Sequence, residues 1–437
     1  MDDTVIGSGK LARRREFLRL AGGATATAAL IGAVKAAFPA GAHAAGAGAE
    51  TKTAKLGYIA LTDASPLIIA REKGFFAKYG LPGVEVLKQA SWAATRDNLE
   101  LGSGGGGIDG AHIMTPMPYF MTLGTVTKNN VPVPMHILAR LNTNGQGISV
   151  EKEYLSAKVQ LDAGKMRGII ESRKAKGNKI AMAMTFPGGT HDLWLRYWLA
   201  AGGIDPNRDV EVITVPPPQM VANMKVETME AFCVGEPWND QLVAQKVGYT
   251  AVSTGQLWLN HPEKSLGLRA DWVAKHPRAA QALTAAVIEA QQWCEANKEE
   301  MAQIVSGRDW FKVPVTDIVD RIKGDFTMGD GRAYKNADFA MKFWRDSASY
   351  PFQSHDLWFI TENKRWGYLK QSIDAAAVIK KVNREDIWRS AAKLAGVPAA
   401  QIPKGTSRGV EKFFDGKVFD PAKPDAYLAS LAIKKTA

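Results

Sequence analysis

The chain has 437 residues, of which 46% are hydrophobic and 23% charged, and its formal net charge is +11. This length is enough to bury a sizeable core and suggests two or three structural units. The body of the chain has no uncharged apolar stretch of about 20 residues, which argues against a membrane-spanning helix. Lysine and arginine are dispersed rather than gathered in a stripe, so the charge gives little support for nucleic-acid binding.

Residues 1–44 have the composition of an export signal. The stretch RREFL at 14–18 resembles the twin-arginine signal, which directs folded proteins across a bacterial inner membrane. The stretch AHA at 42–44 fits a cleavage site, so we expect the mature chain to begin near Ala45. No cysteine lies near this position, which excludes a lipid anchor on cysteine. The segment holds six basic and three acidic side chains, so the mature chain carries about +8.

A strand–helix alternation is predicted between residues 54 and 114. Strands are expected at 54–61, 84–89 and 108–114, and helices at 65–80 and 92–102. Ser65 is expected to cap the first helix, with Pro66 as its first residue. This order is typical of half of an open α/β sheet, with ligand-binding loops at the carboxyl ends of its strands.

Gly102, Gly104 and Gly107 match G-x-G-x-x-G, the glycine pattern of dinucleotide-binding loops. Such a loop needs a strand before it, a helix after it and an acidic residue about 20 positions further on. Here a predicted helix precedes the glycines and a predicted strand follows them. No acid occurs between Asp109 and Glu151. We therefore interpret the glycines as a flexible helix-to-strand connector, in which Gly102 ends the helix.

A second α/β unit is predicted after residues 131–150, which are expected to cross over to it. It comprises a strand at 179–187, a helix at 188–204 and strand or loop segments at 209–220 and 229–240. Thr190 is expected to cap the helix and Gly202 to end it. The chain is expected to return near 249–258 and to be helical and polar afterwards. Two such lobes joined by crossovers predict a clamp that closes around a small ligand by hinge motion.

The two cysteines, Cys233 and Cys294, lie in apolar surroundings and have no metal-type spacing. We interpret both as buried small hydrophobic residues. A disulfide between them remains an alternative.

Five short segments carry a family resemblance. They are SWAATRD (91–97), NGQGIS (144–149), GGTHDLW (188–194), VGEPWN (234–239) and NHPEK (260–264). Together they closely resemble the nitrate-binding branch of the periplasmic nitrate/bicarbonate-binding protein family, the substrate-binding components of ABC importers. The likeness extends from about residue 53 to about residue 395.

This resemblance implies an α/β fold, a two-lobed, C-shaped clamp like the type II periplasmic binding proteins, with the ligand between the lobes. Lobe 1 is expected to be discontinuous, with residues 53–140 and about 255–437, and lobe 2 to span 141–254. The segment from about 396 to 437 has no assigned role, and we expect it to wrap one lobe through Phe413, Phe414 and Tyr427.

The resemblance also implies that nitrate is bound by Trp92, Gln146, His191, Gly235 and Lys264, with Gly235 acting through its backbone. Nitrate is planar, singly charged and unprotonated at pH 7, so its site needs donors and a flat wall but no proton acceptor. Lys264 supplies a charge, Gln146 an amide, and Trp92 a ring face or an indole N–H. His191 supplies a ring N–H near a helix N-terminus, whose dipole disfavours its protonated form, so its charge state stays open.

Each of these residues also has a purely structural interpretation. Trp92 could pack in the core, and Gln146 could satisfy backbone groups in the crossover. His191 could be a solvated first-turn residue and Lys264 an ordinary surface lysine. In the bicarbonate branch of the family an acid replaces the lysine and calcium takes part. A one-residue shift between Glu263 and Lys264 would therefore change the expected ligand from nitrate to bicarbonate.

The function implied is a periplasmic solute-binding component that captures nitrate, or nitrite, for assimilation and delivers it to a membrane permease driven by a separate ATPase. No cofactor is expected, except calcium if the ligand is bicarbonate. No H-x-x-H, H-E-x-x-H or G-x-S-x-G spacing occurs, so catalysis is not expected. A cytoplasmic nitrate sensor of the same fold is an alternative against which the export signal argues. Related clamps bind sulfonates, nitriles or pyrimidine precursors, but this donor set favours a small inorganic anion.

Overall fold

The computed structural model of the protein describes residues 48–435. The segment predicted to be an export signal, 1–44, lies outside these residues, so that assignment stays a prediction. The chain from Ala49 onward forms one compact unit. Among the described residues, no helix has the length and apolar character needed to cross a membrane.

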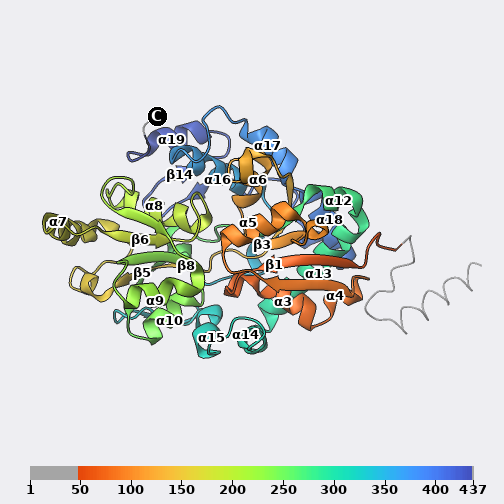
Figure 1. Ribbon diagram of the computed structural model, residues 1–437, viewed down its shortest axis with the longest axis horizontal. Coiled ribbons are helices and arrows are strands. Elements are labelled where there is room, and N and C mark those ends of the chain that lie inside the picture. The colour runs from red at the N-terminus through yellow and green to blue at the C-terminus, as the bar shows by residue number, and fades with distance from the viewer. Residues whose placement is uncertain (1–47, 436–437) are drawn as a thin grey trace, which may run out of the picture. The chain divides into compact units, whose positions relative to one another are not determined.

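Two five-stranded sheets organise the fold (Figure 1). The first has the order β2-β1-β3-β10-β4, in which β1 pairs in parallel with β2 and β3, and β10 runs antiparallel to β3 and β4. Its strands are β1 (Thr53–Tyr58), β2 (Gly83–Lys88), β3 (Gly110–Met114), β4 (Met135–Arg140) and β10 (Lys264–Arg269). The three predicted strands of this unit are confirmed, whereas β4 and β10 were not predicted as strands.

The second sheet repeats this pattern with the order β7-β6-β8-β5-β9. β6 pairs in parallel with β7 and β8, and β5 runs antiparallel to β8 and β9. Its strands are β5 (Gln146–Glu151), β6 (Ala181–Met184), β7 (Glu211–Thr214), β8 (Ala231–Gly235) and β9 (Gly248–Ser253). The repeated topology is the expected α/β clamp architecture.

Helices cover both faces of each sheet (Figure 1). Those in the first part of the chain are α3 (Ser65–Glu72), α4 (Phe75–Lys78), α5 (Trp92–Leu101), α6 (Met117–Leu123), α7 (Arg167–Ala175), α8 (Thr190–Ala201), α9 (Met220–Lys225), α10 (Trp238–Ala244) and α11 (Thr254–Leu257). Short 3-10 turns include η1 (Thr62–Ala64) and η2 (Ser103–Gly105).

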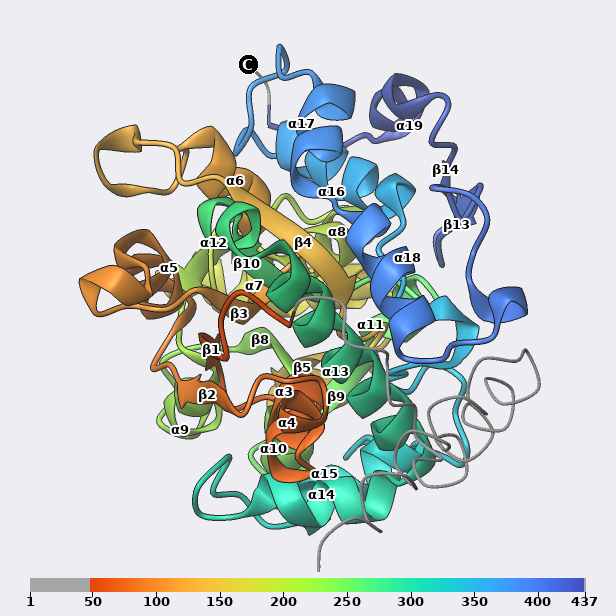
Figure 2. The same ribbon diagram turned by 90° about the vertical axis from the view of Figure 1, so that its right-hand side faces the viewer.

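The chain after β10 is mainly helical, as predicted. Its helices are α12 (Ala270–Lys275), α13 (Pro277–Ala296), α14 (Lys298–Ser306), α15 (Thr316–Lys323), α16 (Gln353–Arg365), α17 (Ala375–Val382), α18 (Glu385–Leu394) and α19 (Pro424–Ser430). Two hairpins interrupt them, β11 (Phe326–Thr327) with β12 (Ala333–Tyr334) and β13 (Glu411–Lys412) with β14 (Val418–Phe419). Figure 2 shows the long α13 beside α3, α4 and α18, which it contacts.

Three local predictions were wrong. Ser65 does not cap α3, because η1 runs directly into the helix; Ser65 is already helical and its Oγ donates to the carbonyl oxygen of Thr62 at 2.6 Å. The expected helix 65–80 is broken at Gly74, whose φ of 71° is left-handed, and α4 starts anew after it. Thr190 does not cap α8, because Gly189 occupies that position and the Thr190 hydroxyl makes a tertiary contact instead.

The interpretation of the glycine-rich segment is confirmed. Gly102 ends α5 with a φ of 65°, and the η2 turn leads from there to β3. This order is helix, connector and strand. It is the reverse of a dinucleotide-binding loop.

The chain passes between the sheets at 141–145 and again at 258–263. These two crossings lie side by side, since Thr143 forms a β-bridge with Pro262 and the Asn144 amide donates to the His261 carbonyl at 3.0 Å. The predicted crossover at 131–150 therefore contains β4 and β5 at its ends. The segment 249–258, where the chain was predicted to return to the first lobe, contains most of β9 and all of α11 of the second lobe. The chain returns to the first sheet directly after this segment.

The C-terminal segment packs on the second sheet's helix layer, as Figure 1 shows for α16, α19 and β14 near α8. Phe413 and Tyr427 belong to the same buried cluster as Trp194 and Trp198 of α8, and Phe414 packs against it. The expected wrapping of one lobe through these rings is confirmed. The exact lobe limits, 53–140 with about 255–437 and 141–254, stay a prediction.

The two cysteines are buried and free, Cys233 on β8 and Cys294 on α13. Burial raises the pKa of both thiols well above the ordinary value, so both stay protonated. Their interpretation as small buried hydrophobic residues is confirmed.

Candidate functional site

The five predicted ligand-binding residues lie at strand ends and helix starts. Trp92 begins α5 and His191 is the second residue of α8, whereas Gln146 begins β5, Gly235 ends β8 and Lys264 begins β10. All five are buried. Parallel strands present their carboxyl ends at one edge of a sheet, where open α/β folds bind ligands. The structural alternatives of a surface lysine and a solvated histidine are therefore wrong.

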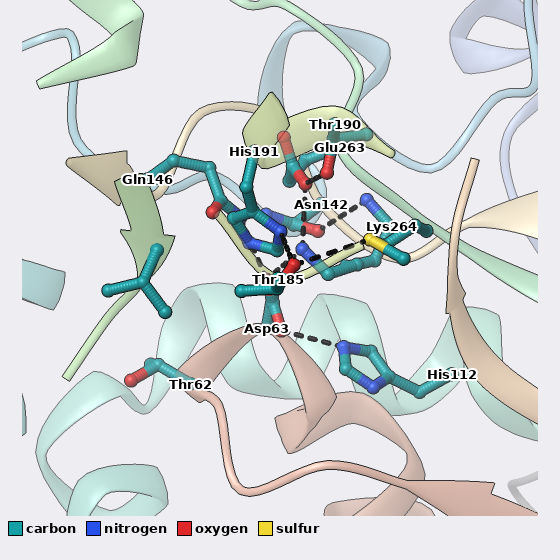
Figure 3. A network of polar contacts seen from close by, with 12 residues as sticks. Thr62, Asp63, His112, Asn142, Gln146, Thr185, Thr190, His191, Glu263 and Lys264 are labelled. Carbon is teal, nitrogen blue, oxygen red and sulfur yellow. Dashed lines mark hydrogen bonds and ion pairs between the residues drawn. The ribbon is translucent and has the colours of Figure 1, made fainter. Parts of the chain in front are cut away.

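The carboxylate of Asp63, in η1 after β1, joins two of these residues, Lys264 and Gln146 (Figure 3). Its Oδ2 lies 3.0 Å from Lys264 Nζ and accepts a hydrogen bond of 3.2 Å from Gln146 Nε2. His112 Nε2, on β3, donates to Asp63 Oδ1 at 2.6 Å. A Cβ added to Gly235 would meet Asp63 Oδ2 and Gln146 Nε2 at 3.4 Å each, so this glycine borders the same cluster.

Lys264 is held between two carboxylates. Besides Asp63, its Nζ contacts Glu263 Oε1 at 2.7 Å. Glu263 also accepts hydrogen bonds from the Thr190 hydroxyl and, at 3.0 Å, from Trp194 Nε1, both on α8. Burial lowers the pKa of Lys264, but the charges of Asp63 and Glu263 outweigh this and raise it. Lys264 is therefore charged at neutral pH.

The pKa values of the two carboxyl groups move in opposite directions. Burial raises the pKa of Asp63, but Lys264 and His112 outweigh burial and bring it to about 2. Burial of Glu263 dominates over the influence of Lys264, so the pKa of Glu263 is raised. Burial also lowers the pKa of His112 in spite of the neighbouring Asp63. At neutral pH a neutral His112 ring thus donates to an ionised Asp63.

His191 is oriented by Thr185, which follows β6. Thr185 Oγ1 lies 2.5 Å from His191 Nδ1, and a hydroxyl that donates there leaves the ring hydrogen on Nε2. Burial and the charge of Lys264 lower the pKa of His191 well below its ordinary value. The ring is therefore neutral at pH 7, which resolves the charge state that the sequence left open.

The Trp92 indole forms a wall of the site. Its ring lies 5.5 Å from Lys264 Nζ, and its centroid lies 5.4 Å from that of His112 and 6.5 Å from that of His191. Trp92 is 0% exposed, so the core-packing interpretation holds as well. Packing and ligand contact are compatible here because the ring is shared between the core and the site.

Several polar atoms of the predicted site residues and of His112 have no hydrogen-bond partner within residues 48–435. They are Trp92 Nε1, His191 Nε2, Gln146 Oε1 and His112 Nδ1. Buried polar groups are almost always paired, so unpaired ones that cluster indicate a place where a ligand or water binds. The indole N–H is a donor, His191 Nε2 is a second donor in the tautomer whose Nδ1 accepts from Thr185, and the third ammonium hydrogen of Lys264 is not taken by Asp63 or Glu263. This set suits a small anion with several acceptor oxygens.

Sequence reasoning missed four residues of this cluster: Asp63, His112, Thr185 and Glu263 as a partner of Lys264. Asp63 had a detectable signal, because an acid directly after a predicted strand lies where ligand loops are expected. Thr185 had a weaker one, at the end of the predicted strand 179–187. His112 lies inside a buried strand and carried no signal of its own.

The described residues contain no cluster of three or more histidine, cysteine or acidic side chains that could hold a metal ion. Glu263, the acid that could serve a cation, is fully engaged by Lys264, Thr190 and Trp194. The expectation of a ligand site without a cofactor stays a prediction.

Two sheets of one topology, two adjacent crossings and a buried donor cluster at the strand ends define a two-lobed solute-binding protein with the periplasmic-binding-protein fold. Residues 47–306 match the NMT1-like family. The chain belongs to this family, together with proteins that bind nitrate, nitrite and bicarbonate.

Three relatives place the chain within this group. The nitrate/nitrite binding protein NrtA of Synechocystis is 61% identical over 388 residues, 88% of this chain and 86% of that protein. The bicarbonate-binding protein CmpA of Synechococcus is 49% identical over 397 residues, 88% of each chain. The crystal structure of the periplasmic nitrate-binding protein NrtA from Synechocystis superposes with a TM-score of 0.86, at 61% identity, over 88% of this chain and 100% of that one.

Proposed function

We propose that this chain is the solute-binding component of an ABC importer and that it captures nitrate, with nitrite as a second candidate ligand. The observation that carries this proposal is the pair of unpaired ring nitrogens, Trp92 Nε1 and His191 Nε2, near the charged Lys264. Nitrate offers three acceptor oxygens and has no hydrogen to donate. Its flat shape also suits the indole wall.

The register of Glu263 and Lys264 favours nitrate over bicarbonate. Lys264 lies in contact with Asp63 and beside the Trp92 ring, within the donor cluster. Glu263 is turned toward Thr190 and Trp194 and holds Lys264 in place. A bicarbonate site would favour an acceptor carboxylate facing the ligand. The higher identity to a nitrate-binding than to a bicarbonate-binding relative supports the same choice.

The proposed mechanism is capture without chemistry. An open clamp binds the anion, and the second lobe closes over it by hinge motion at the two crossings. Closure would form the contacts that join the two sheets' loops: Trp238 Nε1 donates to the Ala60 carbonyl at 3.1 Å, and the Thr62 amide donates to the Glu236 carbonyl at 2.7 Å. The closed form would then dock on a membrane permease that a separate ATPase drives. We assign no reaction to the site.

The proposed location is the periplasm. Two observations support this location. Residues 1–44 resemble a twin-arginine signal, and the similar NrtA of known structure is described as periplasmic. In this role the protein would supply nitrate for assimilation. We propose no cofactor, with calcium required only if bicarbonate proves to be the ligand.

Calorimetric titration of the protein after unfolding and refolding, which strips bound ligand, tests the proposal. Nitrate, nitrite, and bicarbonate with and without calcium are titrated in turn. We expect tight nitrate binding that needs no metal. If bicarbonate is the only anion that binds, and if it binds only with calcium, the ligand is bicarbonate rather than nitrate. A lack of heat with every one of these anions would overturn the assigned ligand class.

A further inference from the structure

The charged groups of the site do not sum to a positive charge, although the proposed ligand is an anion. Lys264 supplies one positive charge, and Asp63 and Glu263 both lie within hydrogen-bond distance of its Nζ. The other titratable groups facing them are three histidines: His112 on Asp63, His191 beside Trp92, and His261, which lies 3.9 Å from Glu263. All three have lowered pKa values because of burial and are neutral at pH 7.

The side chains of this cluster therefore sum to −1 with Glu263 ionised and to zero with Glu263 protonated. A site built only to attract anions would present the lysine without carboxylates. Here the carboxylates engage two of the three ammonium hydrogens and leave one for a ligand. A ligand atom on that third hydrogen lies roughly 4.5–5 Å from the Asp63 oxygen, because the hydrogens of an ammonium are about 109° apart and each hydrogen bond spans about 3 Å.

We propose that Asp63, supported by Glu263, limits the ligand of this site to a single negative charge. This inference rests on the proposed function and assigns a specificity to that same site. Asp63 is a positioning residue: it holds the Lys264 ammonium and the Gln146 amide, and it offsets the lysine's charge. Neutral donors can then bind a monoanion, while a dianion of the same shape is repelled.

The physical basis is that repulsion from a fixed carboxylate grows in proportion to the ligand's charge, and the cost of removing an ion from water grows faster still. Removing the Asp63 charge therefore relieves a dianion about twice as much as a monoanion. Loss of the hydrogen bond to Gln146 weakens both ligands alike, whereas any displacement of the Lys264 charge weakens the dianion more. A fall in the ratio of nitrate to carbonate affinity therefore reports removal of the Asp63 charge, because displacement of the lysine changes the ratio in the opposite direction.

Carbonate is the matched probe for this ratio. It is planar with three oxygens, like nitrate, and differs by one charge. The titrations are made above the second ionisation of carbonic acid, where carbonate is a dianion. The two carboxylates outweigh burial and raise the pKa of Lys264 above its ordinary value. Sulfate at neutral pH serves as a second, tetrahedral dianion.

The control is Asp109→Asn. Asp109 is also a buried carboxylate, 5% exposed, and it accepts hydrogen bonds from the Lys55 amide at 2.9 Å and from Ser103. It precedes β3 and therefore lies at the opposite edge of the first sheet from Asp63. Its substitution removes a buried charge of the same kind at a distance from the site.

The experiment titrates the full-length protein, Asp63→Asn and Asp109→Asn with nitrate and with carbonate. We expect the affinity ratio of nitrate to carbonate to fall at least tenfold in Asp63→Asn, about 1.4 kcal/mol, and to stay within threefold in Asp109→Asn. We expect the affinity ratio of nitrate to sulfate to fall in Asp63→Asn as the ratio of nitrate to carbonate does. If Asp63→Asn does not fold by circular dichroism, Glu263→Gln is measured against the same control and the same tenfold criterion.

Failure of this inference differs from failure of the proposed function. Nitrate binding with an unchanged nitrate-to-carbonate ratio in the variant would overturn the charge limit and leave the function standing. If the unsubstituted protein binds carbonate as tightly as it binds nitrate, the charge limit is overturned without measuring any variant. No nitrate binding in the unsubstituted protein would instead overturn the proposed function.

Discussion

The two sides of the candidate site differ in charge. The side built on the first sheet is charged, with Asp63 and Lys264 in an ion pair and His112 donating to Asp63. The side built on the second sheet is neutral, with His191 held by Thr185. The ions of the charged side pair with each other, although Trp92 Nε1 and His112 Nδ1 on that side have no partner among the described residues, and the neutral side keeps an unpaired His191 Nε2.

This difference follows from the cost of burial. A buried charge without a partner costs several kcal/mol, so Lys264 and Asp63 need each other whether or not a ligand is present. An unpaired neutral N–H costs about 1–3 kcal/mol and can be left open for a ligand. The charged side therefore sets the stability and charge of the site, and the neutral side contributes binding. The predictions below test that division.

Lys264→Glu should have the largest effect because it replaces the cation of the charged side and leaves three buried acids together. We expect nitrate affinity to fall at least 100-fold, about 2.7 kcal/mol. The free energy of unfolding should fall by about 3–5 kcal/mol, the usual cost of breaking a buried ion pair. Calorimetry and urea unfolding measure the two effects. Lys404→Glu, at an exposed position, makes the same charge change and should alter neither.

His191→Ala should separate binding from stability on the neutral side. It removes a donor that no described residue pairs, so we expect nitrate affinity to fall at least tenfold, about 1.4 kcal/mol. No ion pair is broken, so the loss of stability should be smaller than for Lys264→Glu. The same two measurements apply. A variant that binds nitrate normally would remove His191 from the site.

Acid should affect the two sides in different pH ranges. His191 has a lowered pKa, so below about pH 6.5 the unfolded chain binds a proton that the native state does not, and stability falls as the pH falls. Between pH 7.5 and 5.5 this single group should cost about 1.3 kcal/mol. Asp63, with a pKa of about 2, contributes stability that is lost only as the pH falls below about 4.

Urea unfolding of the ligand-free protein and of His191→Gln at pH 7.5 and 5.5 measures the histidine effect. The variant should lose about 1.3 kcal/mol less than the unsubstituted protein over this interval. The other buried histidines remain in both proteins and cancel in the comparison. Equal losses would mean that His191 is protonated in the native state.

Thr185→Val should have the smallest effect. It removes the hydroxyl that lies on His191 Nδ1 but keeps the size of the side chain. The imidazole can then place its hydrogen on either nitrogen, so we expect nitrate affinity to fall about threefold, roughly 0.6 kcal/mol. Calorimetry measures the nitrate affinity, and the loss of affinity in His191→Ala is the largest loss expected for Thr185→Val. A loss larger than that of His191→Ala would indicate that Thr185 contacts the ligand itself.

Three strands of each α/β unit, β1, β2 and β3 in the first and β6, β7 and β8 in the second, could be predicted from the sequence because short apolar runs bounded by glycine and proline are local signals. The strands that run antiparallel to them or pair beyond them, β4, β5, β9 and β10, were not predicted as strands. The missed strand β10 shows the limit of that approach. Its residues, KSLGLR, include charged ends and a glycine, and it becomes a strand by pairing between β3 and β4, which lie far earlier in the chain. The wrong Ser65 and Thr190 caps have a related cause, since neighbouring structure engaged both residues.

From the sequence, the family resemblance of five short motifs pointed to Trp92, Gln146, His191, Gly235 and Lys264, and all five lie buried at strand ends or helix starts. Only the tertiary structure decided how they are charged and oriented. Asp63 and Gln146 are 83 positions apart and meet because the chain crosses between the sheets. Ion pairs and pKa shifts depend on such distant neighbours and on burial, which no local pattern encodes.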